Sequence, residues 1–179
     1  MMKPNLRHLS AAIAATIALA QPQIALAQQC VDQDDVADAT VYAMPLLASA
    51  FTGKCSDKLA ADGFMMTSGD AFVARYAELQ DQKWAGAYRL LLSFAAEGKG
   101  GGPMAEMMAN LPEESVRPFV DAIIEQKVAD EIKVKDCAKI ERGIEMLAPL
   151  PPENMGGLLA FIMDMSGVDK PSLCAYEPK

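Results

Sequence analysis

Histidine is almost absent from this sequence, and that absence excludes more chemistry than any motif suggests. Among 179 residues the only histidine is His8, within an N-terminal segment that has the composition of a secretory leader. Without histidine the mature chain cannot build a Ser-His-Asp triad, a Cys-His pair or a histidine-ligated zinc or copper site. We therefore predict no catalytic residue, no metal site and no cofactor, and we favour a protein that is not an enzyme.

Long apolar runs and phosphate-binding glycine loops are absent as well. The apolar run at residues 9–20 is too short to span a bilayer comfortably, and no later segment is long enough to cross a membrane. Residues 99–102, Lys-Gly-Gly-Gly, lack the G-x-x-x-x-G-K-[ST] spacing of a phosphate loop and are expected to form a flexible connector. No segment alternates polar and apolar residues at period two, so we predict no strand.

The N-terminal segment follows the order of a secretory signal peptide. Lys3 and Arg7 precede the apolar run, and small-x-small sites follow at residues 18–20 and 25–27. This order predicts a signal peptide over residues 1–27 that is cleaved after the second site.

Residues 28–179 would then be a single helical domain in the periplasm, or outside the cell, and large enough for a real core. An uncleaved membrane anchor is less favoured because the apolar run is short. A lipid anchor on Cys30 is disfavoured by the polar Gln28 and Gln29 that precede it.

The mature chain is strongly acidic. Loss of the leader removes Lys3 and Arg7, which lowers the net charge from −8 to −10. Negative charge of this size repels nucleic acid phosphates and anionic lipid headgroups. We therefore predict a protein partner, no nucleic acid and no membrane span in the mature chain, while the sequence leaves the oligomeric state open.

Four cysteines, all beyond the expected cleavage site, predict two disulfides. The number is even and no C-x-x-C motif is present, which in an oxidising compartment favours disulfides over a metal site. The residues are Cys30, Cys55, Cys137 and Cys174.

Helix lengths guide the pairing of these cysteines. A helical hairpin after Cys137 would bring the chain back, so we favour Cys137 with Cys174, and Cys30 with Cys55. A straight helix between Cys30 and Cys55 would separate them by roughly 27 Å, whereas a disulfide needs Cα atoms within about 7 Å. This pair therefore requires a sharp break at Pro45; otherwise the connectivity is crossed, with Cys30 joined to Cys137 or Cys174.

Hydrophobic periodicity predicts an all-α fold: a compact bundle of about six to seven helices with a C-terminal helical hairpin and no sheet. The last helix is expected to bury Met155, Leu158, Leu159, Ile162 and Met163. The expected helices cover residues 32–51, 56–61, 70–98 (as one helix or two), a short segment opened by Pro103, 115–128, 137–147 and 153–166.

Residues 70–98 are predicted to be the central element. Phe72 and Tyr76 lie on one helical stripe, and Trp84 and Tyr88 lie on a second, out of phase with the first by roughly 140°. An element with two apolar stripes must be covered on two sides. We therefore place it between two layers, with one aromatic pair in each core.

Three weaker patterns suggest alternatives. Glu113-Glu114-Ser115 resembles the Glu-Ser pair of lytic transglycosylases, helical periplasmic enzymes that cleave peptidoglycan with one acidic residue. The resemblance implies a glutamate whose pKa is raised by burial. The same residues are also typical of a helix start in which Ser115 is the N-cap.

Carboxylates and methionines give the other two patterns. Asp121 with Glu125, and Asp130 with Glu131, could supply two carboxylates for glycoside hydrolysis, although a solvated face of mixed charge is the usual explanation. The methionines could bind Cu(I) through their thioethers, line a partner groove or simply fill the core. The methionine clusters are Met65-Met66 and the trio Met104, Met107 and Met108.

The favoured hypothesis is a non-catalytic exported protein that binds another protein or serves envelope homeostasis, for example as a chaperone-like or toxin-neutralising protein. The alternatives are a carboxylate-dependent cell-wall hydrolase and a methionine-based Cu(I) binder.

Overall fold

The computed structural model describes residues 30–97, 101–167 and 172–175, so the predicted signal peptide lies outside the described residues. The described chain is all-α, as predicted, and contains no sheet; a single parallel bridge joins Val31 and Leu173. None of its helices combines the length and the apolar character that a membrane crossing requires. The helices are α1 (Gln33–Cys55), η1 (Ser56–Lys58), α2 (Phe64–Thr67), α3 (Gly69–Ala77), α4 (Gln80–Glu97), α5 (Gly101–Ala109), α6 (Glu113–Glu131), η2 (Val134–Asp136), α7 (Cys137–Leu147) and α8 (Pro152–Met165).

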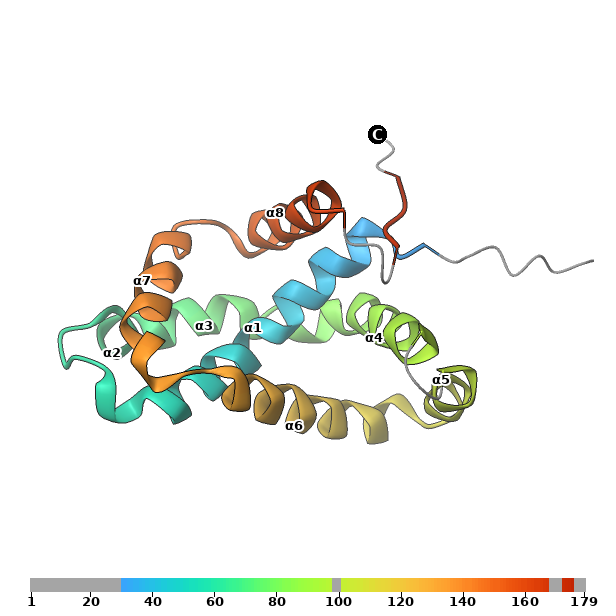
Figure 1. The fold of residues 1–179 in the computed structure, drawn as a ribbon, viewed down its shortest axis with the longest axis horizontal. Coiled ribbons are helices and arrows are strands. Elements are labelled where there is room, and N and C mark those ends of the chain that lie inside the picture. The colour runs from blue at the N-terminus through green and yellow to red at the C-terminus, as the bar shows by residue number, and fades with distance from the viewer. Residues whose placement is uncertain (1–29, 98–100, 168–171, 176–179) are drawn as a thin grey trace, which may run out of the picture.

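Helix α1 is the central element, so the prediction that residues 70–98 occupy the centre is wrong. Figure 1 shows α1 running through the middle of the molecule, with α8 on one side and α6 on the other. Each of the four buried clusters contains at least one α1 side chain. These are Tyr42 and Leu46 in the first cluster, Ala48, Phe51 and Cys55 in the second, Val36 in the third and Val41 in the fourth. A helix with apolar residues on every side must be covered on every side.

Two helices, α3 and α4, occupy this stretch, and the prediction that its two aromatic pairs lie in two different cores is confirmed. The chain breaks at a turn after α3 and resumes as α4 at Gln80. Phe72 and Tyr76 of α3 pack with Val41, whereas Trp84 and Tyr88 of α4 pack with Tyr42. The polar residues between the two stripes therefore mark a real helix boundary.

Pro45 does not interrupt α1. The ring removes one backbone donor, and pairing of Cys30 with Cys55 would have required a sharp break at this position. The helix instead continues for ten residues beyond it to Cys55. Leu46 and Phe51, which follow the proline in α1, are both buried. The burial of these side chains offsets the free energy lost with the missing hydrogen bond.

The disulfides connect Cys30 with Cys174 and Cys55 with Cys137, at Cα–Cα distances of 4.8 and 5.8 Å. The preferred pairing of Cys137 with Cys174 is therefore wrong, and the crossed connectivity is the one observed. An uninterrupted α1 keeps Cys30 and Cys55 at its opposite ends. Their separation is then far longer than a disulfide can span, so they cannot pair.

The expected C-terminal hairpin is also wrong. Helix α7 contacts α2 and η2, whereas α8 packs along α1 (Figure 1), so the two helices cover different parts of the molecule. The linker at residues 148–151 is short enough for a hairpin, but α8 packs along α1 instead. Cys137 therefore meets the end of α1, and Cys174 meets its start.

The flexible connector expected at residues 99–102 is wrong for its last two residues. Gly101 and Gly102 already belong to α5, and residues 98–100 lie outside the described part of the chain.

Candidate protein-interaction surface

One side of α8 is buried against α1. Met155, Gly156 and Ala160 are buried, and Ala160 packs with Val31 and Val36 at the start of α1. The helices approach so closely at Gly156 that a Cβ atom there would lie 2.5 Å from the carbonyl oxygen of Ala37. This contact fixes which side of α8 faces the core.

The opposite side of α8 exposes large apolar residues. Leu158, Phe161, Ile162 and Met165 are 38, 56, 48 and 72% exposed. They occupy positions i, i+3, i+4 and i+7, so they lie along one face of the helix. We call these four residues the outer face of α8; in Figure 1 it belongs to the helix at the upper edge of the molecule.

The prediction that α8 buries Leu158, Leu159 and Ile162 is wrong, because all three are exposed. The apolar residues of α8 occupy most of its circumference, and its polar residues are only Glu153, Asn154 and Asp164. With so few polar positions, the sequence did not identify the side that meets the core. Close packing on Ala37 selects the side with small residues, which leaves the large ones outside.

The methionines are dispersed rather than gathered. Met108 packs against the cluster around Trp84, whereas Met107 on the same helix is exposed. Met65 is buried near Cys55, and Met66 is exposed. The side chain of Met104 lies outside the described residues. In each predicted cluster one described thioether therefore packs in a core and another is exposed, whereas a Cu(I) site needs its sulfurs at one point.

Glu113, Glu114 and Ser115 form the exposed first turn of α6, where Pro112 rather than Ser115 is the N-cap. Glu113 Oε2 accepts a hydrogen bond of 3.1 Å from Trp84 Nε1, which ties the start of α6 to α4. Both glutamates are solvated, so the structure adds no support to the resemblance with lytic transglycosylases.

Two further carboxylates, Asp35 and Asp121, take part in contacts between helices. Asp35 is the one carboxylate that is buried within the described part of the chain, and Arg89 binds it with Nη2–Oδ1 and Nε–Oδ2 distances of 2.6 and 3.0 Å. Asp121 accepts a hydrogen bond from the Tyr42 hydroxyl. A general acid for glycoside hydrolysis needs a carboxyl group in a cleft, free to exchange its proton with substrate, and neither residue is placed in that way.

Tyr42 lies at the centre of a polar network that joins α1, α4 and α6. Its hydroxyl donates to Asp121 and accepts from Arg117 Nε at 3.2 Å. The Arg117 guanidinium lies 5.3 Å from the Tyr42 ring centre and forms an ion pair of 2.6 Å with Asp81. Burial, and next the hydrogen bond to Asp121, raise the pKa of the Tyr42 phenol well above its ordinary value.

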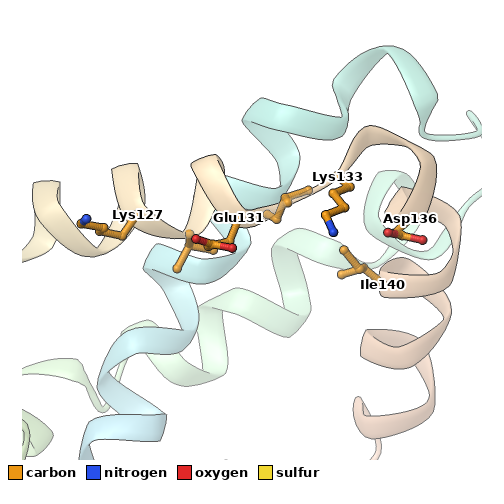
Figure 2. A pocket seen from close by; sticks show the side chains of 7 residues that line it. Lys127, Glu131, Lys133, Asp136 and Ile140 are labelled. Carbon is orange, nitrogen blue, oxygen red and sulfur yellow. The ribbon is translucent and has the colours of Figure 1, made fainter.

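A shallow hollow lies where α6 ends and α7 begins (Figure 2). Its volume is about 450 Å³, and charges of both signs surround it: Lys127 and Lys133 against Glu131 and Asp136. All four residues are at least partly exposed. A wide hollow of mixed charge at a helix junction selects no ligand class. In the described part of the chain, no three His, Cys, Asp or Glu side chains gather to hold a metal ion.

Comparisons with known protein families, with curated proteins and with solved structures found no match. Function must therefore be inferred from the side chains of this chain, and the outer face of α8 is the most distinctive of its surfaces.

Proposed function

We propose that this is an exported, non-catalytic protein that binds another protein through the outer face of α8. The observation that carries the proposal is the exposed stripe of Leu158, Phe161, Ile162 and Met165 on a helix that is otherwise anchored firmly to the core. Soluble monomers rarely leave large apolar side chains contiguous on their surface unless that surface meets a partner.

The stripe is large enough to contribute to binding. Complete burial of one such side chain stabilises by about 1.5–3 kcal/mol. Since each of the four is about half exposed, covering them would contribute on the order of 4 kcal/mol. That would be a central contact of an interface, to which surrounding polar contacts add.

The disulfides support the compartment in this proposal. Two disulfides in one chain are typical of an oxidising compartment such as the periplasm or the extracellular space. A toxin-neutralising protein would hold one partner tightly, whereas a chaperone-like protein would hold many partners weakly; both would use the same face.

Site-specific crosslinking tests the proposal. A photo-crosslinking amino acid is introduced in place of Met165, and in a control in place of Lys139, whose side chain is 84% exposed on α7. We expect crosslinked adducts of higher mass in cells with the Met165 variant and none with the Lys139 variant. Equal adducts from both positions, or none from Met165, would contradict binding at α8.

A further inference from the structure

We infer that the partner segment received by the outer face of α8 is an amphipathic helix whose apolar stripe is bordered by lysine or arginine. This inference rests on the proposed function, because it names the chemistry of the partner that binds the same face.

The spacing of the outer face favours a helix. Leu158, Phe161, Ile162 and Met165 cover two helical turns, a row about 10 Å long with the i, i+3, i+4, i+7 pattern by which helices pack together. Gly157 lies one turn before Phe161, and a Cβ atom there would meet nothing within 4 Å. A side chain of a second helix could occupy that gap in the row.

The charge around this face selects a basic partner. Helix α8 carries Glu153 and Asp164 but no lysine or arginine. Its C-terminal half packs against the start of α1, where Asp32 is exposed. Two cations near α8 are already engaged: Arg89 binds Asp35 beside the start of α1, and Arg75 donates to the Ala148 carbonyl at 2.7 Å and lies over the Phe72 ring. Asp164 is exposed and lies three residues after Phe161, at the border of the apolar stripe, where its carboxylate attracts a cationic group.

The same charges disfavour a second copy of this chain as the occupant. A second mature copy would bring an identical carboxylate border and a further net charge of −10. Like charges placed across an interface oppose association and slow the encounter. A basic helix meets no such opposition.

Three synthetic peptides of equal length test the inference. The first has a leucine stripe and lysines on its polar face, the second has the same stripe with glutamates, and the third keeps the lysines but replaces the leucines with serine. Each peptide, labelled with fluorescein, is titrated with the mature, disulfide-bonded protein at ionic strengths of about 0.05 and 0.5 M, and binding is followed by fluorescence anisotropy.

We expect the leucine–lysine peptide to bind at least about tenfold more tightly than either other peptide, and to lose much of that advantage at high salt. The double variant Leu158→Ser/Ile162→Ser should abolish binding. Its matched control is Phe119→Ser/Ile123→Ser, which removes two exposed apolar residues from α6 and should leave binding unchanged. The double variant Glu153→Gln/Asp164→Asn should weaken lysine-peptide binding about two- to fivefold. Circular dichroism verifies that each variant is folded.

Other outcomes would overturn the inference. Equal affinity for the lysine and glutamate peptides would reject the basic border, while leaving crosslinking at Met165, and hence the proposed function, intact. Equal affinity for the serine–lysine peptide would show general attraction to an acidic protein. If no peptide binds, the helical basic partner is rejected, and an α8-dependent dimer in sedimentation equilibrium would identify a second copy as the occupant.

Discussion

Two tyrosines in neighbouring cores differ in what their hydroxyl groups contact. Both residues are almost completely buried. The Tyr42 hydroxyl is bonded to Asp121 and Arg117, whereas the Tyr76 hydroxyl has no hydrogen-bond partner among the described residues. A buried polar group without a partner lowers stability, whereas removal of a bonded one leaves its partners unsatisfied. The same chemical change should therefore have opposite effects at the two positions.

We predict that Tyr42→Phe lowers the free energy of unfolding by about 1–3 kcal/mol, because Asp121 and Arg117 lose a shared partner. Tyr76→Phe, the matched control, should leave stability unchanged within about 0.5 kcal/mol or increase it. Urea unfolding of both variants at neutral pH measures the difference. A Tyr76→Phe variant that loses as much stability as Tyr42→Phe would contradict the assigned contacts.

The same variants should differ at alkaline pH. Burial is the first cause that raises the pKa of both phenols, so each folded-state pKa lies above the unfolded value of about 10. Burial penalises the ionised phenol, so stability is at its full value below that pH and declines as pH rises from the unfolded pKa toward the folded pKa. Between the unfolded and the folded pKa, each tyrosine lowers the free energy of unfolding by about 1.4 kcal/mol per pH unit. The corresponding phenylalanine variant should lack this decline.

The contacts of these side chains could not be predicted from the sequence. Tyr42 and Asp121 are 79 positions apart, and no local pattern connects them. The cysteines illustrate the opposite case: helix length and disulfide reach are by themselves sufficient to question the pairing of Cys30 with Cys55.

At the scale of single elements, hydrophobic periodicity predicted where the helices lie in the sequence, but it often failed to predict which side of a helix faces the core. The two stripes in residues 70–98 are strong because polar residues separate them, and the structure places them in two cores. Helices α1 and α8 have apolar residues around most of their circumference. The hydrophobic periodicity of such helices does not indicate which side is buried. Neither the central position of α1 nor the outer face of α8 could therefore be predicted from it.

Adjacent glycines on α8 test which side of that helix faces the core. We predict that Gly156→Ala destabilises the fold by about 1–3 kcal/mol, because its Cβ would meet the backbone of Ala37. Gly157→Ala should stabilise the fold by about 0.5–1 kcal/mol, since a Cβ there meets nothing within 4 Å and alanine favours the helix. Thermal or urea unfolding distinguishes them. Similar effects at both positions would mean that α8 is rotated about its axis.

At the scale of the whole molecule, the two disulfides differ in access to solvent. Cys55 and Cys137 are buried in a core cluster, whereas Cys30 is exposed and Cys174 is partly exposed. A reductant must reach a sulfur atom directly, so burial protects a disulfide for as long as the fold is intact.

We predict that mild reduction without denaturant opens Cys30–Cys174 first and leaves Cys55–Cys137 closed until the chain unfolds. Alkylation at successive times, followed by peptide mapping, measures the order and also checks the connectivity. A sample that is unfolded before reduction provides the control, since both disulfides should then open together. Simultaneous loss in the folded protein, or linkage of Cys137 to Cys174, would contradict the arrangement.

The Cys30–Cys174 disulfide also changes how this chain responds to mechanical load. A force applied at those two residues passes through the covalent bond, so the helices between them carry no tension. The disulfide closes the chain between Cys30 and Cys174 into a covalent ring. A pore or unfolding enzyme that pulls at either residue would therefore have to pass two segments of the chain side by side. The fold is thus shielded from pulling at these positions until the disulfide is reduced.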